Sequence, residues 1–269
     1  MKNLSRLALL LAFGATPAPT WAWGPVVHQV VTEKAIDTLP KELRKFYKDH
    51  RLEIPTLAPD AEPAAEEGPE RRFAVDRLMA YPFADLPRSE AELEARFGKE
   101  KAAIGRLPWL IQEAFKDLVA AFRSGDSARI LEVSDRLAGL VTDVRNPLAL
   151  TGNADGQQTG QHGLWIRWST RFPEAAKAAL RLDTDAAHFL DNPNEYVFAI
   201  INGTYIWVDN LLYAEDLAHR GKGGYTELYF AALEERSAVI LRTHLSAAAN
   251  DVGSYWYTAW TDAGRPELK

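Results

Sequence analysis

Apolar residues recur at intervals of three and four over most of this chain, and that spacing constrains the fold more than any other feature. It places the apolar side chains on one face of an α-helix. The first such run extends from Val26 to Leu39 and ends at Pro40, which cannot continue a helix. We expect further helices at residues 41–49, 89–103, 107–123, 127–146, 165–182, 184–190, 195–218 and 226–259. The sequence therefore predicts an all-α protein, a multi-helix bundle around one core.

Two glycines leave alternatives open within these helices. Asn202-Gly203 between β-branched residues is typical of a β-hairpin turn. The apolar residues on both sides nevertheless stay in helical phase, which a hairpin would reset, so we expect a helix with Gly203 as a weak point or a close contact. Gly253 is the position at which the 226–259 helix could divide in two.

Residues 1–22 have the pattern of a secretory signal peptide. Lys2 and Arg6 come before an apolar run, and Ala22 offers a small residue at the cleavage site. The run is too short to span a bilayer, and no later run of about 18 apolar residues follows. We therefore expect an exported protein, periplasmic or secreted, with no transmembrane segment. Residues 23–269 contain no Pro/Gly/Ser-rich linker, which favours one domain.

The charge of the chain limits its partners. The net charge is -6, and removal of a leader with two basic residues makes the mature chain still more acidic. This disfavours non-specific binding to anionic lipid, and we expect no stable nucleic-acid binding. A single phosphate in a pocket stays compatible with it. The chain has no cysteine, so core burial rather than disulfide bonds must stabilise an exported protein.

Cleavage after Ala22 would make Trp23 the first residue of the mature chain, with His28 five positions further on. A free α-amine has a pKa of about 8, so a metal ion can displace its proton near neutral pH. The amine and the carbonyl of one residue also form a five-membered chelate, and His28 could reach the same ion. The plainer interpretation is a packed aromatic residue and a surface histidine.

This N-terminus resembles that of the zinc-dependent phospholipases C and the single-strand-specific nucleases, which are all-helical. The resemblance is strongest to bacterial phospholipase C-like members and continues through residues 71–73, 81–83, 137–148 and 153–167. It implies hydrolysis of phosphoric esters at a cluster of three zinc ions, which activates a water molecule. In the resemblance, Trp23 and His28 bind one zinc, Asp143 bridges it to a second, and Asp60 belongs to the second.

Four ligand positions of that family hold residues that do not bind zinc as imidazole or carboxylate does. These are Gly139, Ala149, Trp165 and Ser169. The third metal would thus have lost its ligands, and we expect at most one or two zinc ions, or none.

Arg71 and Arg72 stand near another missing histidine of the family. They could bind a phosphate, although a solvated basic pair is the simpler interpretation.

Three functional hypotheses follow. The first is an exported, degenerate member, a pseudoenzyme that binds a phosphate-bearing or lipid-like ligand or a protein partner. The second is a metal-dependent phosphodiesterase with a reduced site and Asp143 as its catalytic residue, since Trp23, His28 and Asp143 have little reason to persist together otherwise. The third is a helical protein whose cleft is filled. Asp143 lies about 120° from the centre of its helix's apolar stripe, which suits a cleft wall or solvent, where Arg136 could pair with it.

Overall fold

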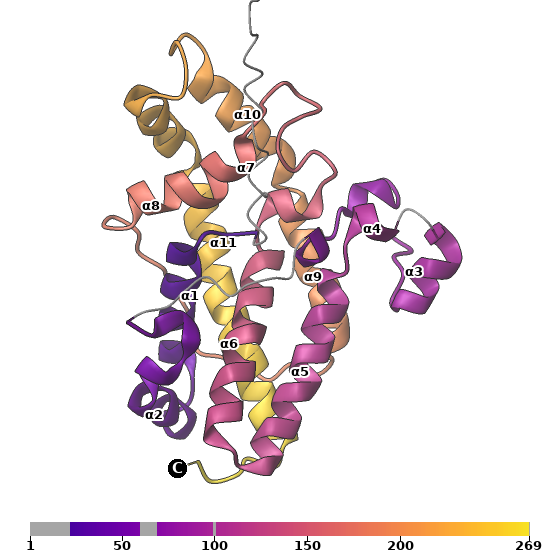
Figure 1. Ribbon diagram of the computed structural model, residues 1–269, viewed down its shortest axis with the longest axis vertical. Helices are drawn as coiled ribbons and strands as arrows, with labels where there is room; N and C mark the ends of the chain where they lie inside the picture. The colour runs from indigo at the N-terminus through magenta and orange to yellow at the C-terminus, as the bar shows by residue number, and fades with distance from the viewer. Residues whose placement is uncertain (1–21, 60–68, 99–100, 269) are drawn as a thin grey trace, which may run out of the picture.

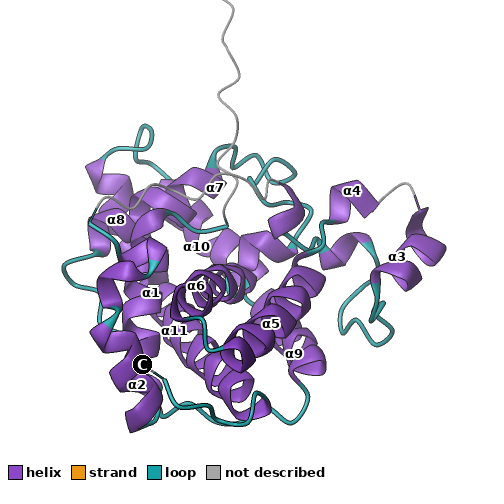
Figure 2. Ribbon diagram, turned by 60° about the horizontal axis from the view of Figure 1, so that its bottom comes forward, coloured by secondary structure: helices purple, strands orange, loops and turns teal. Residues whose placement is uncertain are grey.

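The computed structural model describes residues 22–59, 69–98 and 101–268, and every regular element within those ranges is helical. The prediction of an all-α fold is confirmed (Figures 1 and 2). The helices are α1 (Pro25–Thr38), α2 (Lys41–Asp49), α3 (Glu90–Phe97), α4 (Lys101–Ile104), α5 (Leu107–Ser124), α6 (Ser127–Val144), α7 (Leu164–Ile166), α8 (Phe172–Ala176), α9 (Pro193–Tyr205), α10 (Val208–His219) and α11 (Glu227–Asp262). Shorter 3-10 turns include Pro69–Arg71 and Pro147–Leu150, and Arg167–Arg171 forms a π-helical turn. The expected leader, up to residue 21, and Asp60 lie outside the described residues.

The 36-residue helix α11 runs the length of the molecule, and α1, α5, α6 and α10 pack against it (Figure 1). Helices α5 and α6 form an antiparallel hairpin. Gly125, with φ 71°, ends α5 in the left-handed conformation, and the Asp126 carboxylate caps α6 by accepting from the backbone N–H of Arg129 at 3.1 Å. Helices α3 and α4 project to one side of this bundle (Figures 1 and 2).

The two glycines of the long helices have different roles. A Cβ atom on Gly253 would lie 2.0 Å from Thr38 Oγ1, so glycine allows α1 to approach α11 closely, and α11 is not divided there. Gly203 lies inside α9 with nothing within 4 Å of a Cβ atom. The hairpin reading is therefore rejected, and Gly203 is not a close contact. The expected 195–218 helix divides instead after Tyr205, and α10 begins at Val208.

The predicted helix at residues 184–190 is wrong, and the one predicted at 165–182 ends at Ala176. Residues 183–190 have no regular secondary structure. Four of their backbone N–H groups donate instead to polar side chains of α11 that are spaced four residues apart, and the N–H of Ala187 donates to the carbonyl of Thr38. In the four hydrogen bonds to α11, of 2.9–3.2 Å, the N–H groups of Asp183, Asp185, His188 and Leu190 donate to the side-chain oxygens of Ser246, Asn250, Ser254 and Thr258, in that order. A ladder of this kind replaces the hydrogen bonds of a helix.

None of the helices in the described part of the chain has the length and apolar character needed to cross a membrane.

Candidate functional site

Asp143 lies in the last turn of α6 and is completely buried, with 0% of its surface exposed. The expectation of a cleft wall or a solvent-facing position is therefore wrong. Three groups converge on its carboxylate. The backbone N–H of Trp23 donates to Oδ1 at 3.3 Å, His28 Nε2 lies 3.3 Å from the same oxygen, and Arg71 Nε donates to Oδ2 at 2.6 Å. The structure thus brings together three of the four predicted metal ligands, and adds a guanidinium group.

The first described residues are held firmly beside Asp143. The indole N–H of Trp23 donates to the backbone carbonyl of Thr142 at 3.1 Å. The side-chain amide of Asn146 donates both to the carbonyl of Ala22 and, at 3.0 Å, to the hydroxyl of Ser169. Trp23 and His28 are each 1% exposed, so Trp23 is a packed aromatic residue and the interpretation of His28 as a surface histidine is wrong.

Arg71 comes from the turn Pro69–Arg71 and is 7% exposed, so it is not part of a solvated basic pair. Its guanidinium lies over Gly139, one helical turn before Asp143, where a Cβ atom would lie 3.0 Å from Nη2. Any larger side chain at that position would displace the guanidinium. Arg136 forms an ion pair with Asp117 at 3.6 Å, on the surface, and the guanidinium group that pairs with Asp143 belongs to Arg71.

Two carboxyl groups on one side of α6 have pKa values that are shifted in opposite directions. Burial raises the pKa of Asp143, but the positive charges of Arg71 and His28 outweigh it, so the pKa is lowered and the group is ionised. Asp135 lies two turns earlier and accepts from the backbone N–H of Thr56 at 3.2 Å. Burial dominates there and raises the pKa of Asp135. Asp143 is therefore the charged centre of the cluster.

Arg72, next to Arg71, is half-buried over the ring of Trp165, with its guanidinium carbon 5.6 Å from the ring centroid. Burial, and then the positive charge of Arg77, lowers the pKa of Arg72. Arg71 is thus buried and Arg72 half-buried, and each faces a position where the resemblance expects a zinc ligand, Gly139 and Trp165 respectively.

The positions that lack family ligands lie around this cluster in space. Gly139 faces Arg71, the carbonyl of Ala149 accepts from Phe73 N–H at 2.8 Å, Trp165 faces Arg72, and the carbonyl of Ser169 accepts from Gly24 N–H at 2.8 Å. Sequence reasoning missed the role of Arg71. The available signal was Arg71 near a position where the resemblance expects a histidine, together with Gly139 one turn before Asp143.

Within the described ranges, the residues around Asp143 do not by themselves fit a zinc ion. Among the described residues, no group of three or more His, Cys, Asp or Glu side chains is placed to hold a metal. More directly, Oδ2 of Asp143 accepts from the guanidinium of Arg71 at 2.6 Å. A permanent positive charge this close to the carboxylate would repel a divalent ion bound to the other oxygen. Asp60, the remaining predicted ligand, lies outside the described residues.

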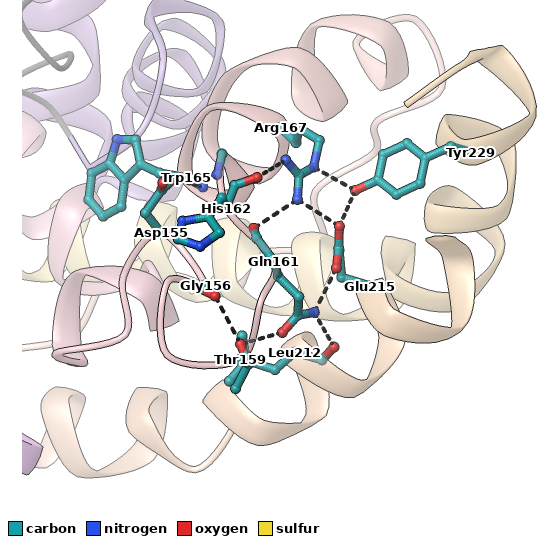
Figure 3. A network of polar contacts seen from close by, with 11 residues as sticks. Asp155, Gly156, Thr159, Gln161, His162, Trp165, Arg167, Leu212, Glu215 and Tyr229 are labelled. Atoms are coloured by element: carbon teal, nitrogen blue, oxygen red, sulfur yellow. Dashed lines mark hydrogen bonds and ion pairs between the residues drawn. The ribbon is translucent and has the colours of Figure 1, made fainter. Parts of the chain in front are cut away.

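The loop at residues 153–163, another part of the resemblance, is closed by a second buried network (Figure 3). Glu215 on α10 accepts from Arg167 at 2.8 Å, Tyr229 at 2.9 Å and Gln161 at 2.6 Å. Arg167 also donates to the backbone carbonyl of His162 at 2.7 Å, whereas the side chain of His162 is exposed. Each of these polar groups has a partner within the protein, so the network holds the loop against α10 and α11.

A groove of about 650 Å³ lies between the outer face of α1 and residues 177–183. Its floor includes the aliphatic side chains of Val30, Leu57, Leu180 and Leu182. Four basic residues border it, Lys34, Arg51, Lys177 and Arg181, together with three acidic ones, Glu33, Asp37 and Asp183. Arg51 pairs with Glu33 and Asp37 with Lys48, whereas Lys34 and Lys177 form no ion pair within the described residues.

No protein-family model matches the chain, and no curated protein matches it.

Proposed function

We propose that this protein is an exported, non-catalytic relative of the zinc-dependent phospholipases C and nucleases, and that it acts by binding. One observation carries the proposal: the Asp143 carboxylate is sealed in the protein and neutralised by Arg71 at 2.6 Å. A phosphodiesterase of that superfamily needs an open site at which metal ions meet the substrate phosphate and a water molecule. A buried ion pair offers neither a vacant coordination position nor access to substrate.

The groove beside α1 is the place we assign to a ligand. Its aliphatic floor suits an apolar chain, and the ammonium groups of Lys34 and Lys177 suit an anionic head group. The ligand class that matches both features is a phosphate-bearing, lipid-like molecule. The net charge of -6 makes the groove's basic border a local feature, so binding would depend on these lysines rather than on the overall field.

Isothermal titration with monomeric dihexanoyl phosphatidic acid tests the binding. We expect saturable binding to the processed chain. The Lys34→Ala/Lys177→Ala variant should bind about 100-fold more weakly, because each of the two lost charge-assisted hydrogen bonds is worth a factor of about ten. Lys116→Ala, an exposed lysine on α5, is the matched control and should bind as the wild type does. Equal affinity in all three proteins would remove the groove from the proposal, and no binding at all would remove the ligand class.

A second candidate function is a metal-dependent phosphoric-ester hydrolase with a reduced metal site. It is favoured by the convergence of the Trp23 nitrogen and His28 on one oxygen of Asp143. Elemental analysis of the processed protein and hydrolysis of bis(p-nitrophenyl) phosphate separate the two candidates. The hydrolase requires bound zinc, activity that a chelator abolishes, and loss of activity in Asp143→Ala. Our first proposal requires that zinc be far below one ion per chain and that no divalent ion elicit hydrolysis.

A further inference from the structure

We infer that Arg71 is a built-in cation that occupies the place of a metal ion beside Asp143, and that Gly139 is the residue that makes room for it. The inference concerns the architecture of the cluster. It rests on the proposed loss of zinc, but it does not depend on which ligand the protein binds.

The steric part of the argument comes from α6. Asp135, Gly139 and Asp143 follow one another at intervals of four residues, so they form one row along the helix. The Arg71 guanidinium lies over the middle of this row, 3.0 Å from where a Cβ atom on Gly139 would lie, and reaches Asp143 Oδ2 at 2.6 Å. A glycine in the interior of a helix is unfavourable, and here its small size has a specific use.

The electrostatic part comes from Asp143. A completely buried carboxylate needs a compensating positive charge, which a metal ion or a basic side chain can supply. Arginine remains protonated in proteins and its planar group suits a carboxylate, so it meets this need permanently and without a metal equilibrium. Because the charge is covalently attached, the cluster should be indifferent to chelators.

The direction in which Gly139→Ala changes the melting temperature tests the steric claim. In the wild-type background the added methyl group presses on the guanidinium, and we expect the melting temperature to fall. In an Arg71→Ala background the same substitution meets open space, and helix propensity should raise the melting temperature by about 2 to 4 °C. Gly203→Ala, at a helical glycine with nothing within 4 Å, should raise it in both backgrounds. An effect of Gly139→Ala that has the same sign in both backgrounds overturns the inference.

If Arg71→Ala does not give folded protein, Arg71→Lys provides the second background, because it keeps the charge and removes the bulky group over Gly139. There Gly139→Ala should no longer lower the melting temperature.

Metal uptake tests the electrostatic claim. After dialysis against zinc and then buffer, the processed wild type should retain almost none, whereas Arg71→Ala/Gly139→His should retain about one ion per chain, because it removes the cation and restores an imidazole one turn from Asp143. Stoichiometric zinc in the wild type, or no gain in the folded double variant, overturns the replacement of a metal by Arg71. A failed ligand titration would instead count against the proposed function alone.

Discussion

The pairing of Arg71 with Asp143 makes a quantitative prediction about stability. Arg71 is 7% exposed and Asp143 is 0% exposed, and their Nε and Oδ2 atoms are 2.6 Å apart. Removing one partner of such a pair leaves the other charge buried and uncompensated, which costs about 3 to 5 kcal/mol. We therefore expect Arg71→Met and Asp143→Asn each to lower the free energy of unfolding by about that amount. Asparagine keeps an oxygen that can accept from the Trp23 N–H, so its effect should come mainly from the lost charge.

The double variant distinguishes this reason from simple loss of packing. When both charges are removed, no uncompensated charge stays buried, so the loss should be smaller than the sum of the two single losses by about 1 to 3 kcal/mol. Urea unfolding of the processed chain, followed by circular dichroism, measures all four free energies. The matched control is the exposed pair of Arg136 and Asp117, 3.6 Å apart, for which the coupling should stay below about 1 kcal/mol. Additive losses at Arg71 and Asp143 would refute the reasoning.

Three further predictions concern the rest of the bundle. Gly253→Ala should destabilise the protein by about 1 to 3 kcal/mol, because its methyl group would overlap Thr38 Oγ1, whereas Gly203→Ala should stabilise it; similar melting temperatures for the two variants would contradict this. Burial, and then Arg145, lowers the pKa of His244 to about 3, so the native state binds fewer protons than the unfolded state between about pH 6.5 and pH 3 and loses stability as the pH falls. His244→Leu should remove this dependence, so the free energy of unfolding of the variant relative to the wild type should rise by about 2 kcal/mol from about pH 7 to pH 5. Urea unfolding at both pH values measures it, and a difference that is the same at both would show that His244 does not titrate in this way. Ser254→Ala should speed hydrogen exchange at His188 N–H, which donates to the Ser254 hydroxyl at 3.2 Å, while leaving Leu190, bound to Thr258, almost unchanged.

The sequence predicts most of the helices because their apolar faces are read directly from residue spacing. Helix α1 shows this well, since it begins at Pro25 and ends before Pro40 as the pattern indicates. The prediction fails at residues 184–190, where the partners of the backbone N–H groups are side chains of α11 far along the chain. Local spacing contains no information about such a ladder, so a helix was the natural but wrong expectation.

For the candidate site, the grouping of Trp23, His28 and Asp143 came from the resemblance and not from residue spacing, and in the structure the three residues lie together. The spacing of the apolar residues in α6 mistakes the position of Asp143 itself. Placing Asp143 by its angle from the centre of one apolar stripe is valid only if the helix has a single buried face. Helix α6 is covered by α5, α1 and α11, and the N-terminal segment covers the remaining sector at Asp143. The partner of the carboxylate lies 72 residues away in a short turn, where no periodicity marks Arg71 as buried.

The convergence of Trp23, His28 and Asp143 does not by itself require a metal, because structural contacts account for each of them. Trp23 contributes its indole N–H to Thr142 and its backbone N–H to Asp143, and its ring packs 5.8 Å from that of Trp168. Asp143 in turn joins the N-terminal segment, α1, the turn at residues 69–71 and α6 at one point. Replacing it with an apolar residue would leave the guanidinium of Arg71 buried without its carboxylate partner, so loss of the carboxylate would be costly for folding in any case. The contacts of Trp23, His28 and Asp143 therefore serve the folding of the chain whether or not a metal ion binds, because a basic side chain already supplies the positive charge that the buried carboxylate needs.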